Sequence, residues 1–165
     1  MALSTSARTK RDGSVAVSDS GASNTLTQAC EPGDFTYSAG GYATERYMDR
    51  TEHKNPRKGD AQVTTLGWSA IVTTMYSATE ATMPDVCEYW NRTNSYVNDN
   101  WTSTLDGSSD VFSVDVTYGI DGTYVGEADV TILFNHVSLT GSFTEGAPST
   151  YAVTGEASII GPVVS

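Results

Sequence analysis

Alternation of apolar and polar residues is the feature of this sequence that most limits what it can fold into. In the run QVTTLGWSAIVTT (62–74), one face holds four apolar residues: Leu66, Trp68, Ala70 and Val72. The runs 111–118 and 127–135 alternate with the same period of two. Because successive side chains of a β-strand point to opposite faces, this period predicts strands with one buried face.

The rest of the sequence fits an all-β domain. Further strands are predicted at 14–17, 25–30, 35–38, 137–143 and 149–160. Only 38% of the 165 residues are hydrophobic and 18% are charged, which suits one domain with a core of moderate size. We therefore expect a mainly β fold, a β-sandwich or partly open barrel of about seven or eight strands, with one short flanking α-helix and a long inter-strand loop. Residues 1–13 are predicted to be a flexible arm and 14–165 the domain.

One segment, TMPDVCEYWN (82–91), predicts a helix. Thr82 suits the N-cap position, and Asp85 three residues later completes a capping box. A helix over about 83–91 would place four residues on one face: Met83, Val86, Tyr89 and Trp90. We expect that face to pack against the sheet, where Trp68 lies on the apolar side of its strand.

Charge is distributed unevenly along the chain, whose net charge is -11. The predicted loop 42–60 holds five of the nine basic residues: Arg46, Arg50, Lys54, Arg57 and Lys58. Residues 93–165 contain nine acidic residues and no Lys or Arg. This division suggests that the loop makes polar contacts to acidic neighbours, while the remainder presents a like-charged surface.

Candidates for catalysis or metal binding are weak. His53 and His136 lack metal-ligand spacing, and Glu127 with Asp129 reads as a solvated pair rather than a calcium site. Cys87 with His136 is a possible nucleophile pair, but a cysteine on an apolar helix face is usually part of the core. We expect no enzyme activity, no cofactor and no metal. Cys30 and Cys87 are predicted to be reduced, and no signal peptide or membrane span is expected.

Several short stretches occur in a characteristic order. A DG and SDS turn (12–20) precedes NTLT (24–27), EPGDF (31–35), YMDR (47–50) and KGD (58–60). A strand with WSAIVTT (68–74) and the capped segment TMPDVCEYW (82–90) follow. Taken in order over about residues 11–160, this pattern resembles the major tail proteins, or tail tube proteins, of long-tailed, siphovirus-like bacteriophages.

The resemblance implies hexameric rings that stack into a tube through which DNA passes without specific binding. A sheet from each subunit would join a barrel around the lumen, and the long loop would reach the adjacent ring. The implied loop contacts are Glu45, Arg46, Asp49, Arg50, Lys54, Arg57 and Lys58. Together with strand alternation, the resemblance suggests four lumen-facing carboxylates: Asp115, Glu127, Asp129 and Glu156.

The same resemblance implies other partners and a location. The partners would be further copies of this chain and the tail terminator, tape measure and baseplate proteins of one virion, assembled in the host cytoplasm. Two other classes stay open. One is a capsid decoration or head-completion protein. The other is a secreted β-sandwich module that binds carbohydrate or acts as an adhesin, with Trp68, Trp90 and Trp101 available for stacking.

Overall fold

The structure is a computed structural model. It describes residues 13–28, 34–46, 48–49, 52–53, 56–75, 77, 81–88, 101–105, 112–122, 128–157 and 163–164, with only the backbone at 48–49 and 52–53.

Most of the described strands form one antiparallel sheet of eight strands. Their order is β2-β1-β9-β10-β11-β8-β3, and β12 pairs with β10 off this path. The bounds are β1 Gly13–Ser18, β2 Thr25–Gln28, β3 Thr36–Ser38, β8 Thr64–Ile71, β9 Val114–Ile120, β10 Val130–Thr144, β11 Thr150–Ala157 and β12 Val163–Val164. A 3-10 turn, η1 (Ser20–Ala22), links β1 to β2. The predicted mainly β fold with a short helix is confirmed, and the sheet is not closed into a barrel.

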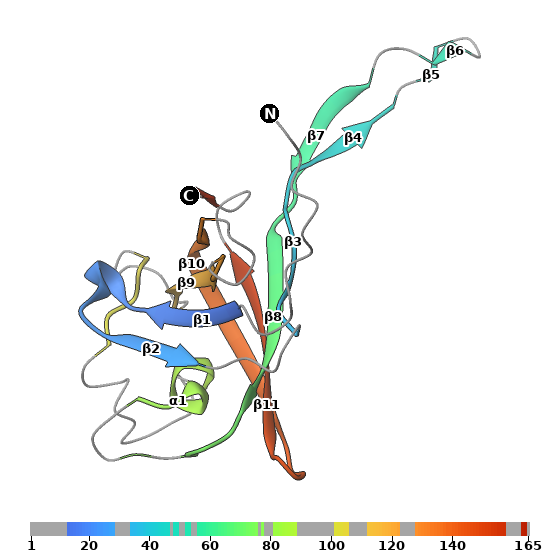
Figure 1. Cartoon of the computed structure of the whole chain (residues 1–165). Coiled ribbons are helices and arrows are strands. Elements are labelled where there is room, and N and C mark those ends of the chain that lie inside the picture. The colour runs from blue at the N-terminus through green and yellow to red at the C-terminus, as the bar shows by residue number, and fades with distance from the viewer. Residues whose placement is uncertain are drawn as a thin grey trace.

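A bulge in β10 divides this sheet in two. Residues 130–134 of β10 pair with β9, whereas 137–144 pair with β11. The pairing register shifts between Phe134 and Val137, and His136 has a positive φ of 53°. A bulge bends a strand without ending it. The two strands predicted at 127–135 and 137–143 are therefore parts of the single strand β10. We call β2, β1, β9 and residues 130–134 the first half-sheet, and residues 137–144, β11, β8 and β3 the second half-sheet; β1 and β2 run across the direction of β8 and β11 (Figure 1).

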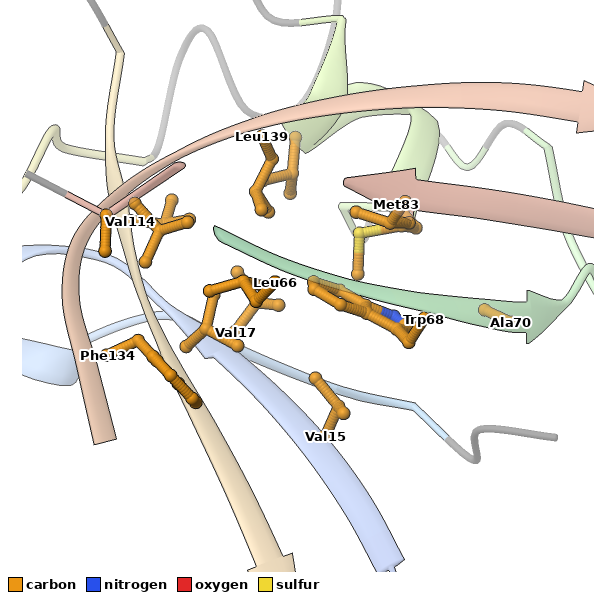
Figure 2. Packing of buried hydrophobic residues seen from close by; sticks show 14 of the residues in the cluster. Val15, Val17, Leu66, Trp68, Ala70, Met83, Val114, Phe134 and Leu139 are labelled. Atoms are coloured by element: carbon orange, nitrogen blue, oxygen red, sulfur yellow. The ribbon is translucent and has the colours of Figure 1, made fainter. Parts of the chain in front are cut away.

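The hydrophobic core lies between the two half-sheets. Val17 of β1 faces Leu66 and Trp68 of β8 (Figure 2), and all three are buried. The predicted alternation is confirmed along β8 and over Val114, Asp115 and Val116 of β9; beyond Val116, β9 is half-buried throughout. Aromatic rings add contacts between β3 and the first half-sheet. Phe35, just before β3, stacks on Tyr118 with 4.1 Å between ring centroids, and such pairs stabilise beyond their buried area.

Helix α1 (Met83–Cys87) begins where the sequence predicts. The Asp85 carboxylate accepts hydrogen bonds from the backbone N–H of Thr82, at 2.8 Å, and from its hydroxyl, at 2.7 Å. Met83 and Val86 are each 2% exposed and belong to the same buried cluster as Trp68. Tyr89 and Trp90 lie outside the described residues. The hydroxyl of Tyr151 in β11 donates to Glu88 Oε1 at 2.9 Å, which ties the end of the helix to the sheet.

The charged segment expected to be a loop forms a β-hairpin that we call the arm. Strand β4 (Tyr42–Glu45) pairs with β7 (Arg57–Ala61), and β5 (Met48–Asp49) pairs with β6 (Glu52–His53). The arm continues from β3 and β8 and projects away from the rest of the molecule (Figure 1). Neither β4 nor β7 buries an apolar face, so apolar alternation could not reveal them. Backbone pairing holds these two strands together.

Candidate functional site: the arm and a hydroxyl-rich sheet face

The arm is joined to the sheet through two hydrogen bonds at its base. The backbone N–H of Gly40 donates to the buried hydroxyl of Thr64 at 2.8 Å, and the N–H of Gln62 donates to Gly41 O at 2.7 Å. A Cβ on Gly40 would collide with the carbonyl oxygen of Gln62. The close backbone approach therefore requires glycine at position 40 and sets how the arm leaves the sheet.

Charged and apolar groups are exposed together on the arm. Lys58 Nζ lies 3.1 Å from the centroid of the Tyr42 ring, a cation–π contact. The Glu45 side chain lies over Gly59, where a Cβ would come 2.9 Å from its Cγ. Four of the expected contact residues are exposed on the arm: Glu45, Arg46, Arg57 and Lys58. Asp49 lies in β5, and Arg50 and Lys54 lie outside the described residues.

The outward face of the second half-sheet carries mostly hydroxyl groups. Strand register places on it Thr36, Ser38, Thr65, Ser69, Ser138, Thr140, Ser142 and Thr154. Glu156 shares the face and is the one charged residue there among the residues that the structure describes. Part of this face is hollowed into a depression with a volume of about 620 Å³.

Several of these hydroxyls bond within the sheet. The hydroxyls of Thr140 and Thr154 share a hydrogen bond of 2.8 Å, and Thr36 Oγ1 donates to Gly67 O at 3.4 Å. Ser138 Oγ donates to Glu156 O at 3.5 Å. This face is polar, and some of its hydroxyl donors bond to the protein itself. Among the described residues it carries no cation to attract a polyanion.

The three described carboxylates that were expected at the lumen lie on different elements of the fold. Asp115 Oδ1 accepts the backbone N–H of His136 at 2.9 Å and so serves the β10 bulge. Asp129 Oδ1 accepts the N–H of Gly122 at 2.8 Å, beyond the opposite end of β9. Glu156 belongs to the second half-sheet, and Glu127 lies outside the described residues. Sequence alternation could not distinguish carboxylates that hold backbone groups from carboxylates that only face solvent.

Sequence reasoning missed a buried carboxylate, Asp19, at the end of β1. It is 2% exposed and accepts hydrogen bonds from the backbone and side chain of Asn24, each at 2.8 Å, and from the hydroxyl of Thr102 at 3.3 Å. Burial raises the pKa of Asp19, but the hydrogen bonds from Asn24 and Thr102 together outweigh it, so the pKa lies below its ordinary value. The SDS stretch indicated the turn but not this role.

The described residues hold no group of three or more His, Cys, Asp or Glu side chains placed to bind a metal ion. No α-helix within them has the length and apolar character needed to span a membrane. Cys87 is half-buried at the end of α1.

Solved structures with a similar fold belong to contractile injection systems. A chain of the anti-feeding prophage (AFP) baseplate, 6-fold symmetrised, matches all of this chain and 97% of its own length, with a TM-score of 0.58 and 8% identity. A chain of the AFP tube terminating cap matches with a TM-score of 0.54 and 15% identity, covering 100% of this chain and 94% of its own length.

A third match is a chain of the PVC sheath/tube terminator of an extracellular contractile injection system in its extended state. It covers 92% of both chains, with a TM-score of 0.52 and 16% identity. No family model and no curated protein matches the sequence. At these identities the likeness establishes a shared fold.

Proposed function

We propose that this protein is a tube-forming structural component of a phage-like tail, which assembles as stacked hexameric rings around a channel. The observation that carries the proposal is the arm, a hairpin that continues from β3 and β8 and extends beyond the body (Figure 1). An isolated two-stranded hairpin is at best marginally stable in water. An arm rich in charge and poor in buried surface is therefore well suited to contact a neighbouring copy.

Lateral assembly would use the edges of the second half-sheet. Within the described residues, β3 pairs only with β8, and residues 138–144 of β10 pair only with β11. Open edges accept further strands, so copies placed side by side can extend the sheet around a ring. The 6-fold symmetry of the AFP baseplate supports six copies per ring for this fold.

The hydroxyl-rich face would then line the channel, with Glu156 repeated around each ring. DNA would pass without specific binding, because the described part of this face offers a carboxylate and engaged hydroxyls but no cation. The proposed partners are further copies of the chain and the tail terminator, tape measure and baseplate proteins of the same virion. Assembly would take place in the cytoplasm of the host.

A second candidate is a terminator or cap ring at the end of such a tube. It is supported by the likeness to the AFP tube terminating cap and to the PVC terminator. A terminator forms a single ring and does not stack, so the two candidates predict different particles.

Electron microscopy of the purified, concentrated protein tests the proposal. We expect hollow tubes of constant diameter that lengthen with protein concentration. A variant in which an Asn-Gly turn replaces residues 44–58 should form rings that do not stack, whereas Glu156→Gln should form normal tubes. Single rings from the unaltered protein would favour the terminator, and normal tubes from the shortened arm would contradict the proposal.

A further inference from the structure

Large apolar side chains are exposed at both ends of the second half-sheet. Near the arm, Tyr42 is 47% exposed and Val63 is 54% exposed. At the far end, Ile71 is 42% exposed and Phe143 is 45% exposed. Figure 1 places the arm and the turn between β10 and β11 at opposite ends of the molecule. Exposed apolar groups bordered by charge are typical of interaction surfaces.

We call the first group, Tyr42, Lys58 and Val63, the arm root, and we call Phe143 and Glu145 the tip. Ile71 is left out of the tip, because it pairs with Thr150 on the hydroxyl-rich face, whereas Phe143 pairs with Tyr151 on the opposite face. Hydrogen bonds hold the turn of the tip in place. The backbone N–H of Val72 donates to Ser149 O at 3.0 Å, which fixes the turn to the end of β8. The Ser149 hydroxyl also donates to Gly146 O at 3.3 Å. The turn that carries Glu145 is therefore stabilised by hydrogen bonds of its own residues.

The two groups have opposite charge. Glu145 is exposed beside Phe143, and Lys58 is exposed above the Tyr42 ring. The imbalance extends to the sequence that follows residues 1–12, a segment with three basic residues and one acidic residue. Residues 13–41 and 62–165 hold fifteen acidic residues and one basic residue, Arg92, whereas the arm, 42–61, holds five basic and four acidic residues. An arm that docks on another copy therefore meets a strongly acidic surface, which favours the association.

We infer that the tip of one copy docks on the arm root of a second copy, with Glu145 next to Lys58 and Phe143 against Tyr42 and Val63. This rests on the proposed function and names the surface that receives the arm. A contact between two different surfaces closes into a ring only if its rotation returns to the first copy, and otherwise it propagates as a filament. With the two surfaces at opposite ends of the molecule, we take the contact to repeat head to tail along a filament. Because both groups lie on the strands β8 and β10 or their continuations, the repeat would run along these strands.

Charge reversal on each side separately tests the docking. Glu145→Lys places two positive groups at the contact, and Lys58→Glu places two negative groups there. Each variant alone should reduce the sedimenting, tube-forming fraction by about tenfold or more at low salt, since apposed like charges are strongly unfavourable. Asp121→Lys is the matched control: it changes net charge as Glu145→Lys does, but at an exposed position just after β9, outside the arm, the tip and the hydroxyl-rich face, and it should form tubes normally. Unchanged thermal melts of the three monomers establish that each one folds.

An equimolar mixture of Glu145→Lys and Lys58→Glu gives the sharpest result. The reversed, positive tip of the first variant fits the reversed, negative arm root of the second. The unaltered tip of the second variant fits the unaltered arm root of the first. The mixture should therefore recover tubes that neither variant forms alone.

Two outcomes would overturn the docking and leave the proposed function intact. One is normal tubes from Glu145→Lys alone, and the other is a mixture of the two variants that stays unassembled. Unaltered protein that stays monomeric would overturn both the docking and the proposed function.

Discussion

At the scale of single residues, carboxylates that accept backbone hydrogen bonds hold the turns and the bulge that shape the fold. Asp19 joins three segments: the end of β1, the turn at Asn24 and the segment at Thr102. Its pKa is lowered because these hydrogen bonds together favour the ionised form more strongly than burial opposes it. The carboxylate therefore contributes stability at neutral pH that acid removes.

We predict that Asp19→Ala lowers the free energy of unfolding by about 2–3 kcal/mol at pH 7, because it removes the charged acceptor of several part-buried hydrogen bonds. A lowered folded-state pKa gives full stabilisation above the ordinary value of 3.8. That stabilisation disappears as pH falls below 3.8 through the folded value. Urea unfolding of both proteins across this range measures the difference. A gap between them that is independent of pH would contradict the assignment.

Asp115 stabilises the bulge at which β10 passes from one half-sheet to the other. Its carboxylate accepts the N–H of His136, a residue with positive φ. Asp115→Ala should lower the free energy of unfolding by about 1–3 kcal/mol. Asp129→Ala is the matched control, since that carboxylate is exposed and accepts one N–H in a turn. This variant should lower the free energy of unfolding by less than Asp115→Ala does. Equal costs in denaturant titrations would show that the bulge does not depend on Asp115.

At the scale of elements, the base of the arm decides where the arm points. Gly40→Ala brings a Cβ against the carbonyl of Gln62, whereas nothing lies within 4 Å of a Cβ on Gly41. We predict that Gly40→Ala redirects the arm and shortens tubes, while Gly41→Ala leaves tube length unchanged. Electron microscopy of tube lengths, with a thermal melt for each variant, measures this. Tubes of normal length from Gly40→Ala would argue against a directed arm.

The elements that could be predicted from the sequence are those in which burial or capping determines the type of side chain at each position. Strands β8 and β9 alternate because one face is buried, and Thr82 with Asp85 marks the start of α1 because the helix needs that cap. The arm and the unbroken β10 carry no such signal. Backbone pairing holds the arm, and the bulge of β10 depends on a contact between Asp115 and His136, which lie twenty-one residues apart.

The same reasoning explains the candidate site. The basic residues of the arm stood out by charge alone, and several of them are exposed there. The hydroxyl-rich face did not stand out, because its Ser and Thr residues come from four separate strands. Only register brings Thr36, Thr140 and Thr154 into one row across the sheet.

At the scale of the whole molecule, the proposed channel depends on one face without cations. Thr154→Lys would place a positive charge on that face in every copy, and each ring would then carry several. We predict that tubes of this variant retain short duplex DNA in a pull-down at low salt and release it as salt rises. Tubes of Thr154→Gln should retain none. Equal retention by both would show that the face does not meet DNA.

The central claim is that the outward face of the second half-sheet lines a channel. A cryo-EM reconstruction of the assembled protein tests it most directly, because it locates Thr154 and Glu156 relative to the tube axis. We expect stacked sixfold rings with these two side chains on the inner wall and the arm crossing to the neighbouring ring. A reconstruction with this face on the outer wall, or buried between rings, would contradict it.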